Sequence, residues 1–372
     1  MSALVRLSTN GVSPDGVAVR DGISREASKH KVSGIGVVGL GYWGPNWVRN
    51  LHQLRLARRV VACDLDQKRR EHVKGLYAGV EGSSNLDDLL LDREIEGVVI
   101  ATPVSSHYPL AKKALLAGKS VLVEKPLAMS SAQAAELVRI ARERGKVLMV
   151  GHTFEYSAPV LKMRDIIESG ELGDMFYISS IRANLGLIQH DVNVCWDLAT
   201  HDISIITMLM GGRLPEAVSC QGQSHYKRGI EDVAMLALHF PRNVIAFIHV
   251  SWLDPSKIRR TTIVGSKKML VYDDLALQEK VRIYDKGVDV APYYDTFGEF
   301  QFSYRYGNVM IPRIDEAEPL KLECEHFVDC IQNNQIPRSD GLSGLRVVSV
   351  LEAANLSLKN GGATVPVARA EV

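Results

Sequence analysis

The sequence has almost no net charge and few cysteines, and each shortage argues against a class of partner or site. The formal net charge is +1, which gives no electrostatic reason to expect nucleic acid or an anionic membrane as a partner. The five cysteines are scattered and include no C-x-x-C pair, so neither a disulfide framework nor a zinc site is indicated. His107, His152 and His190 also lack ligand spacing with cysteines or carboxylates, and we expect no metal.

Long apolar runs are missing as well. No run reaches the ~20 apolar residues of a membrane span, and residues 1–31 contain no apolar core of a secretory signal. We therefore expect a cytoplasmic protein that has no membrane partner.

What remains is an ordinary globular composition, with 46% apolar and 23% charged residues in a chain of 372. A chain of this length exceeds most single hydrophobic cores, so two domains are expected. Residues 1–31, with mixed charges and turn signals, are predicted to form a flexible arm. The patterns that follow place one domain over residues 32–151 and a second over 152–372.

The first domain opens on a glycine motif. An apolar run ends in G-x-G-x-x-G at Gly39, Gly41 and Gly44, and a helical pattern follows at once. In a dinucleotide site the first glycine allows the turn, the second admits the pyrophosphate, and the third lets helix and strand pack closely. The helix N-terminus then supplies free N–H groups and the positive end of its dipole. The motif predicts a dinucleotide-binding fold.

The next strand ends in a carboxylate, Asp64, 20 positions after Gly44. A carboxylate there accepts hydrogen bonds from the ribose hydroxyls and repels a 2′-phosphate, which favours NAD over NADP. Lys68, Arg69 and Arg70 lie close enough in sequence to offer a phosphate some compensation, although they also fit a solvated helix face.

Strands and helices alternate to residue 151, which predicts a doubly wound parallel sheet with ligands at the carboxyl ends of its strands. Expected strands precede Gly39 and cover 59–64, 97–101, 120–124 and 147–150; expected helices cover 45–56, 67–77, 86–91, 105–118 and 131–144. The candidate cofactor-binding residues lie at or just after strand ends and are Gly39, Gly41, Tyr42, Trp43, Gly44, Asp64, Thr102, Pro103, His107, Glu124, Lys125 and Pro126.

In the second domain the order of predicted elements changes, because several strands follow one another and are joined by short turns. Its strands are expected over 174–183, 217–225, 233–240, 244–252, 260–265 and 268–272, and its helices over 159–169, 196–210, 320–332 and 341–358. Consecutive strands of this kind predict an antiparallel sheet.

Three motifs occur in a specific order: the glycine motif, Glu124-Lys125-Pro126 at a strand end, and Asp197-x-x-x-His201 on a helix. Together they resemble the Gfo/Idh/MocA oxidoreductases over residues 32 to about 366. The resemblance implies an α/β chain, with an N-terminal Rossmann domain and a C-terminal α+β domain carrying a mostly antiparallel open sheet. In this family that sheet often forms an oligomer interface, so a homodimer or homotetramer is implied.

The chemistry of these residues is consistent with that resemblance. Oxidising a sugar alcohol removes a hydride and a proton, so a proton acceptor must stand beside the hydroxyl. Lys125 at its strand end can donate to the oxygen, with Glu124 positioning it. Asp197 and His201, four apart, share one helix face; alone, the pair also fits a helix N-terminal aspartate and a core histidine. The resemblance implies that His201 is the general acid/base, Lys125 its partner and Asp197 a substrate-binding group.

Residues 184–202 and 41–46 resemble family members that act on nucleotide-linked amino sugars, notably UDP-N-acetylglucosamine or its uronate at C3. Gln189 and Asn193 are candidate partners for sugar hydroxyls, although loop amides also close turns. Arg259 is a candidate for a phosphate, although a charge at a strand edge is common.

The function expected is therefore NAD-dependent oxidation of a sugar hydroxyl, with a 2-oxoacid as a possible second electron acceptor. The alternatives are an NAD-using glycosidase that oxidises C3 transiently, a free-sugar or inositol dehydrogenase, a ketosugar reductase, and a non-catalytic sensor of NAD and sugar.

Overall fold

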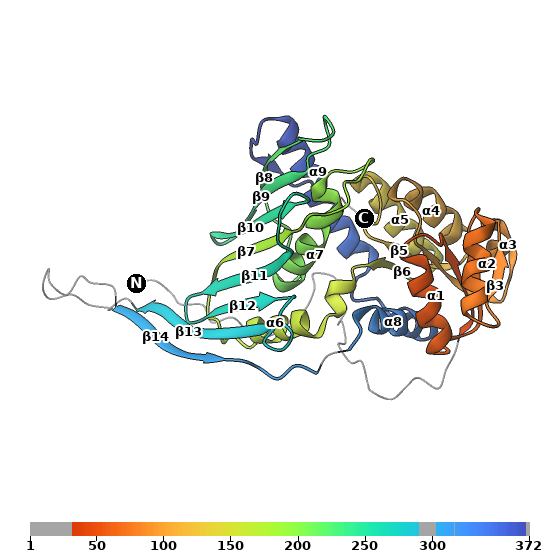
Figure 1. Cartoon of the computed structure of the whole chain (residues 1–372), viewed down its shortest axis with the longest axis horizontal. Helices are drawn as coiled ribbons and strands as arrows, with labels where there is room; N and C mark the ends of the chain where they lie inside the picture. The colour runs from red at the N-terminus through yellow and green to blue at the C-terminus, as the bar shows by residue number, and fades with distance from the viewer. Residues whose placement is uncertain (1–31, 290–302, 316, 370–372) are drawn as a thin grey trace, which may run out of the picture.

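The computed structural model describes residues 32–289, 303–315 and 317–369, which form two β-sheets with helices packed against them (Figure 1). The first sheet is parallel and the second is mostly antiparallel. The predicted fold class, a Rossmann domain followed by an α+β domain, is confirmed. The arm predicted over residues 1–31 lies outside the described residues.

The first sheet consists of β1 (Val32–Val38), β2 (Ala57–Cys63), β3 (Glu81–Ser83), β4 (Ile95–Ile100), β5 (Ser120–Glu124) and β6 (Leu148–Gly151). Its strands lie in the order β3-β2-β1-β4-β5-β6 and all pair in parallel. The order reverses between β1 and β4, and ligands of such sheets bind beyond the carboxyl ends at that point. The predicted cofactor residues Gly39 to Gly44, Asp64 and Lys125 follow strands at this edge.

The helices between these strands are α1 (Gly44–Gln53), α2 (Gln67–Leu76), α3 (Leu86–Leu91), α4 (His107–Leu116) and α5 (Ser131–Arg144). Their ends agree with the sequence to within about three residues, because side-chain caps mark several of them; Asp66, for example, accepts the Lys68 amide. The start of α4 differs: a 3₁₀ turn precedes it, since the Ser106 hydroxyl donates to Thr102 and to the Pro103 carbonyl instead of capping the helix.

In the described residues the second sheet has nine strands: β7 (Met175–Ala183), β8 (Ala217–Gln223), β9 (Val233–Phe240), β10 (Val244–Ser251), β11 (Ile258–Gly265), β12 (Met269–Asp273), β13 (Val281–Asp289), β14 (Ser303–Met310) and β15 (Val365–Pro366). Their order is β14-β13-β12-β11-β7-β10-β9-β8-β15, and only the β7–β10 pair among those described is parallel. The strands β13 to β15 are additions to the prediction. Nearly every residue of β14 is exposed, so its sequence has no apolar–polar alternation.

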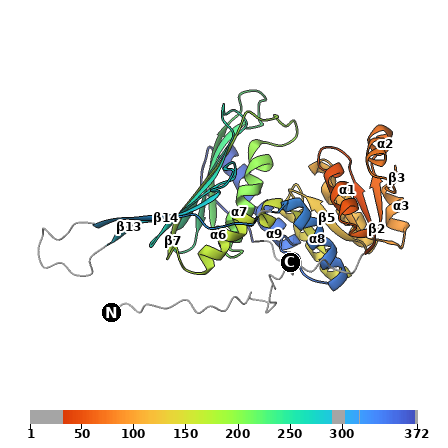
Figure 2. The same cartoon turned by 60° about the horizontal axis from the view of Figure 1, so that its bottom comes forward.

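The helices of the second half are α6 (Ala158–Glu168), α7 (Thr200–Leu209), α8 (Pro319–Asn333) and α9 (Gly341–Lys359). Figure 2 shows α6, α7 and α9 on one side of the second sheet. Among the helices of the described residues, none is long and apolar enough to cross a membrane.

The continuous helix predicted over 196–210 is wrong in one respect. A π-helical turn, Cys195–Ala199, precedes α7. The Thr200 hydroxyl donates to the Trp196 carbonyl oxygen, and such bonding back along the chain loosens a helix backbone. π-Turns are frequent at functional sites, and this one contains Asp197.

Helix α8 returns from the second half to cover the first sheet. It contacts α1 and β1, and Phe327 is fully buried in a cluster with Val32 and Ile35. Gly97 in β4 permits the close approach, because a Cβ built there would lie 2.8 Å from Ile331 Cδ1 and 3.3 Å from Phe327 Cζ. The two halves of the chain therefore share a core.

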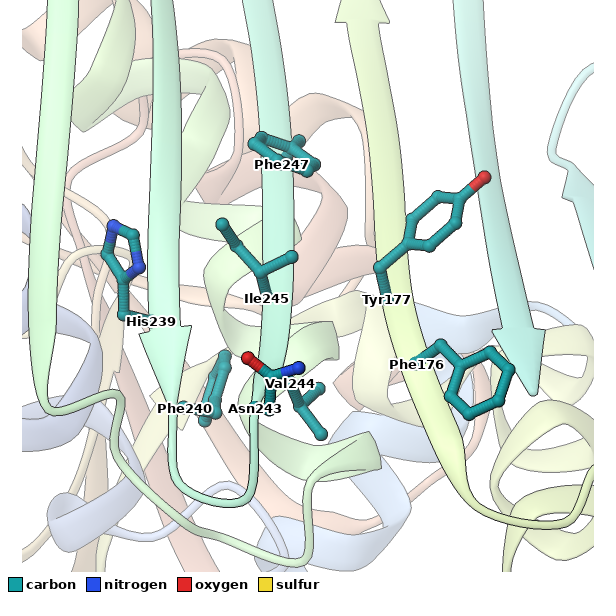
Figure 3. Close-up of a pocket in the computed structure, with 8 residues that line it drawn as sticks. All are labelled: Phe176, Tyr177, His239, Phe240, Asn243, Val244, Ile245 and Phe247. Carbon is teal, nitrogen blue, oxygen red and sulfur yellow. The ribbon is translucent and has the colours of Figure 1, made fainter. Parts of the chain in front are cut away.

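The opposite face of the second sheet carries large apolar side chains. Figure 3 shows Phe176 and Tyr177 on β7 and Ile245 and Phe247 on β10. These side chains line a shallow pocket of about 450 Å³. Phe176 is 53% exposed and Phe247 46%. We call this surface the outer sheet face.

We predict that Phe327→Ala lowers the free energy of unfolding by about 3–5 kcal/mol, the usual cost of removing a buried phenyl ring. Urea unfolding followed by circular dichroism measures it. Leu91→Ala on the surface of α3, where the leucine is 82% exposed, should change stability by less than about 0.5 kcal/mol. An unfolding midpoint equal to that of the unmodified protein would show that α8 contributes little to the shared core.

Candidate active site

A cavity of about 340 Å³ lies between the carboxyl ends of β5 and β6 and the second half of the chain. The side chains that line it and enter the argument below are Trp43, Glu124, Lys125, Thr153, Phe154, His201, Arg259, Asp274 and Lys280. Both halves therefore contribute to its wall, as the predicted catalytic residues require.

The glycine loop at the end of β1 has the form that a dinucleotide needs. Gly39 has a φ of 91°, and a Cβ at Gly44 would lie 1.9 Å from the Gly39 carbonyl oxygen. At Gly41 no atom of the described residues lies within 4 Å of a built Cβ, so this backbone faces open space. Helix α1 begins directly after the loop without a side-chain cap, which leaves its N-terminus available to a pyrophosphate.

Asp64, directly after β2, lies beside this loop. Its Oδ2 accepts the Leu40 amide at 2.6 Å and its Oδ1 accepts the Asp66 amide at 2.8 Å. The carboxylate is thus oriented by the backbone at the place where a ribose diol binds. Arg69 lies 3.7 Å from Asp64 Oδ2, and Arg70 donates to the Asp64 and Leu65 carbonyl oxygens.

Lys125 follows β5 and is joined to Pro126 by a cis peptide bond. Its Nζ donates to the Asp197 carbonyl oxygen at 2.8 Å and to Asp197 Oδ1 at 3.2 Å. Asp197 Oδ2 in turn accepts the Trp252 indole N–H at 3.0 Å. The carboxylate predicted to bind substrate therefore also holds the lysine in place.

Glu124 is buried behind Lys125. The Trp47 indole N–H donates to its Oε1 at 2.8 Å, and burial raises the pKa of the Glu124 carboxyl above its ordinary value. This links α1 of the glycine loop to the lysine strand. His107 makes a second link, because its ring nitrogens lie 2.8 Å from the carbonyl oxygens of Pro126 and Thr102.

His201, near the start of α7, lines the cavity. The His201 ring meets the Phe154 ring edge-on, with centroids 5.1 Å apart. The Arg182 guanidinium lies over the Phe154 ring, 4.6 Å from its centroid. Burial, and then the charges of Lys125 and Arg182, hold the pKa of His201 well below its ordinary value. The imidazole is therefore uncharged at neutral pH, with one ring N–H and one lone pair.

Among the other predicted substrate residues, the structure brings Arg259 to the cavity wall, where its guanidinium pairs with Asp274 at 3.2 Å. Gln189 and Asn193 are not among the lining residues of the described chain. The Asn193 amide donates to Glu231 and Asn355, and its oxygen accepts the Trp196 amide. Asn193 thus anchors the π-helical turn.

The predicted cofactor residues differ in how they contribute. Trp43 lines the cavity, whereas Tyr42 is 83% exposed and meets Trp43 in a T-shaped contact. Thr102 and Pro103 lie in the loop after β4, and this loop passes close to Gly39. In the described residues no group of three or more histidines, cysteines or carboxylates has the arrangement to hold a metal.

Several lining residues were missed by sequence reasoning, and four of them carry polar or aromatic side chains that enter the argument: Thr153, Phe154, Asp274 and Lys280. Thr153 and Phe154 could have been predicted, because they come soon after the end of β6, where ligands of such a sheet bind. Asp274 and Lys280 flank the turn between β12 and β13. Because β13 was not predicted, the turn that leads into it was not recognised either.

The fold and the site together define a two-domain oxidoreductase that uses a dinucleotide. Residues 33–152 match the family described as "Oxidoreductase family, NAD-binding Rossmann fold", and residues 160–271 match the "GFO/IDH/MocA C-terminal domain". The two matches cover more than half of the chain, which belongs to the Gfo/Idh/MocA family. The predicted family and the predicted cofactor, NAD, are confirmed.

Similar proteins include dehydrogenases of different substrates. The scyllo-inositol 2-dehydrogenase (NAD(+)) of Bacillus subtilis is 24% identical over 337 residues, which is 87% of this chain and 94% of that protein. Several other curated relatives match over only about half of their own length.

Two solved structures have the same fold. UDP-N-acetylglucosamine 3-dehydrogenase GnnA from Acidithiobacillus ferrooxidans has a TM-score of 0.72 at 22% identity, covering 88% of this chain and 98% of that one. WlbA dehydrogenase from Bordetella pertussis, in complex with NADH and UDP-GlcNAcA, has a TM-score of 0.74 at 21% identity and covers 92% and 100%.

We predict that Asp64→Ala weakens NAD binding by about 10-fold or more, the scale of a lost hydrogen bond to a charged group, and narrows the preference over NADP. Isothermal titration with each cofactor measures both. Asp66→Ala, which removes the cap of α2 and an exposed ion pair with Arg69, is the matched control. An unchanged ratio of NAD to NADP affinity in Asp64→Ala would remove Asp64 from the cofactor site.

Proposed function

We propose that this protein uses NAD to oxidise a sugar hydroxyl to a ketone, and that its substrate is a UDP-linked N-acetylamino sugar oxidised at C3. The observation that carries the proposal is that Lys125 and His201 line one cavity together with Trp43 of the glycine loop, while Asp197 bonds to the lysine. A hydride acceptor, a hydrogen-bond donor and a proton acceptor are what the oxidation of an alcohol needs.

In this proposal the cofactor-binding residues and the three residues at the cavity have distinct tasks. Gly39 to Gly44 and Asp64 hold the pyrophosphate and ribose of NAD, and the chemistry that NAD supplies when bound is acceptance of a hydride. Lys125 donates to the substrate oxygen and steadies the charge that develops there. His201 accepts the hydroxyl proton, and Asp197 keeps the lysine oriented.

The nucleotide-sugar substrate is supported by two lines of reasoning. The matched structures named for UDP-N-acetylglucosamine and UDP-GlcNAcA cover most of the chain, and residues 184–202 resemble the corresponding stretch of enzymes that use such sugars. Arg259 on the cavity wall is a cation placed for the anionic part of this substrate. The second candidate is a free cyclic polyol, favoured by the inositol dehydrogenase that matches over 94% of its length.

Mass spectrometry of UDP-N-acetylglucosamine and its uronate, each incubated with enzyme and NAD, tests the proposal. We predict loss of two hydrogens from one of them. A 2-oxoacid is included as a proposed second electron acceptor, because a retained reduced cofactor would otherwise stop the reaction after one turnover. Lys125→Ala and His201→Ala should each lower turnover by at least ~10², the scale of general acid–base catalysis, while NAD still binds.

The control for these variants is Lys112→Ala, which removes a surface lysine of α4 that pairs with Glu136 and should leave turnover unchanged. If neither nucleotide sugar changes while scyllo-inositol is oxidised, the substrate is a free polyol. If Lys125→Ala or His201→Ala turns over like the unmodified enzyme, its assigned role is refuted.

We also infer that the outer sheet face is an interface between copies of this chain, in a homodimer or homotetramer. Large side chains gather there, including Phe176 and Phe247 (Figure 3), and Met235 on the neighbouring strand is 59% exposed. Extended apolar patches on soluble proteins usually mark interaction sites.

We predict that Phe247→Asp lowers the oligomeric mass in size-exclusion chromatography with light scattering, because a carboxylate buried in an apolar interface is costly. Leu91→Asp, an equally drastic change on α3, should leave the mass unchanged. A monomeric parent protein, or a Phe247→Asp variant of unchanged mass, would contradict this use of the outer sheet face.

A further inference from the structure

His152 is a buried histidine whose polar atoms have no evident structural use. It directly follows β6 and is 1% exposed. Neither ring nitrogen has a hydrogen-bond partner among the described residues. Burial, and then the charge of Lys125, lowers the pKa of His152 to about 3, so the ring is neutral and offers one N–H donor and one lone pair.

Native proteins rarely leave such groups unpaired, because a buried polar atom without a partner costs about 1–3 kcal/mol. Where they do, a role in function is a common reason. A leucine of similar size would remove this cost, so stability alone does not explain the histidine.

The complementary atom belongs to His201. Its Nδ1 is also buried and without a partner among the described residues, while the His201 side chain lines the cavity. The Thr153–Tyr156 turn that directly follows His152 packs against α7, and Phe154 of that turn contacts the His201 ring, so the two histidines lie on neighbouring segments. For His201 Nε2 to accept a proton from a substrate, the hydrogen of the neutral ring must sit on Nδ1.

We propose that His152 is a positioning residue that accepts the Nδ1–H of His201 through one bridging water, and so keeps the Nε2 lone pair free for the substrate proton. The proposal rests on the proposed role of His201 as proton acceptor. In other enzymes a carboxylate orients the histidine in this way. A neutral imidazole can do the same without adding a negative charge, which would raise the pKa of His201.

Phe154 restricts the geometry further. Its edge-on contact with His201 limits rotation of that ring, and Arg182 above Phe154 is itself fixed by a buried ion pair with Asp202, at 2.6 Å from Nε to Oδ2. The orientation of His201 is therefore fixed by packing, and His152 is left to decide which nitrogen carries the hydrogen.

The test is nuclear magnetic resonance of ¹⁵N-labelled histidine side chains in the full-length enzyme with NAD and no substrate. Ring nitrogen shifts distinguish the two tautomers, and His201→Gln identifies the His201 signals. We expect the Nδ1–H tautomer in the parent protein and in His152→Gln, whose amide oxygen can accept the hydrogen bond. In His152→Leu the population should move toward Nε2–H.

Turnover gives the second readout. We expect His152→Leu to lower kcat by at least ~10-fold, the lower range for loss of an orienting partner, with little change in the KM for NAD or in Tm. His52→Leu is the matched control, because His52 on α1 also has a buried Nδ1 without a partner in the described residues.

An Nε2–H or a charged His201 in the parent protein would overturn the proposal, whether or not the leucine variant folds. An unchanged His201 tautomer in a folded His152→Leu variant would do so as well. The spectra require no substrate, so they decide on His152 even if neither nucleotide sugar is oxidised. Conversely, an unaltered tautomer would leave the mass-spectrometric result standing.

Discussion

The contact between Lys125 and Asp197 is the interaction on which the site depends, because its two residues come from different halves of the chain. Lys125 ends a strand of the first sheet, whereas Asp197 lies in the π-helical turn of the second half. The turn is anchored by Asn193, and the carboxylate is held by Trp252 just after β10. Both supports are hydrogen bonds made within the protein, so the carboxylate that holds the lysine is itself held in place.

The buried titratable groups near this contact have pKa values shifted toward their uncharged forms. Burial, and then the charges of Lys125 and Arg182, hold the pKa of His201 well below its ordinary value, while burial raises the pKa of Glu124 and Glu323 and favours their uncharged forms. The Lys125–Asp197 pair is the charged pair nearest the chemistry. In the mechanism that we propose, a neutral proton acceptor and a fixed cation would both act on the oxygen of the alcohol.

Much of this site was accessible from sequence, because parallel strands bring their carboxyl ends to one edge. Gly39 to Gly44, Asp64 and Lys125 each follow a strand of that kind, and a glycine needed for a turn or for close packing leaves a readable pattern. Arg182 and Phe154 were not accessible, since they act through tertiary contacts that no local periodicity records. The same holds for α8: its apolar face was recognised, but not that it would pack under β1 of the other domain.

The packing of α8 against the first sheet also bears on how substrate and cofactor are selected. The shared core ties the two halves together, and the cavity takes its cofactor side from the first sheet and its far wall, with Arg259 and Asp274, from the second. In the proposed function, residues of the first sheet would bind the cofactor and residues of the second would select the substrate. Relatives named for an inositol and structures named for a nucleotide sugar can share the first part and differ in the second, since a fold carries function only through the side chains of its site.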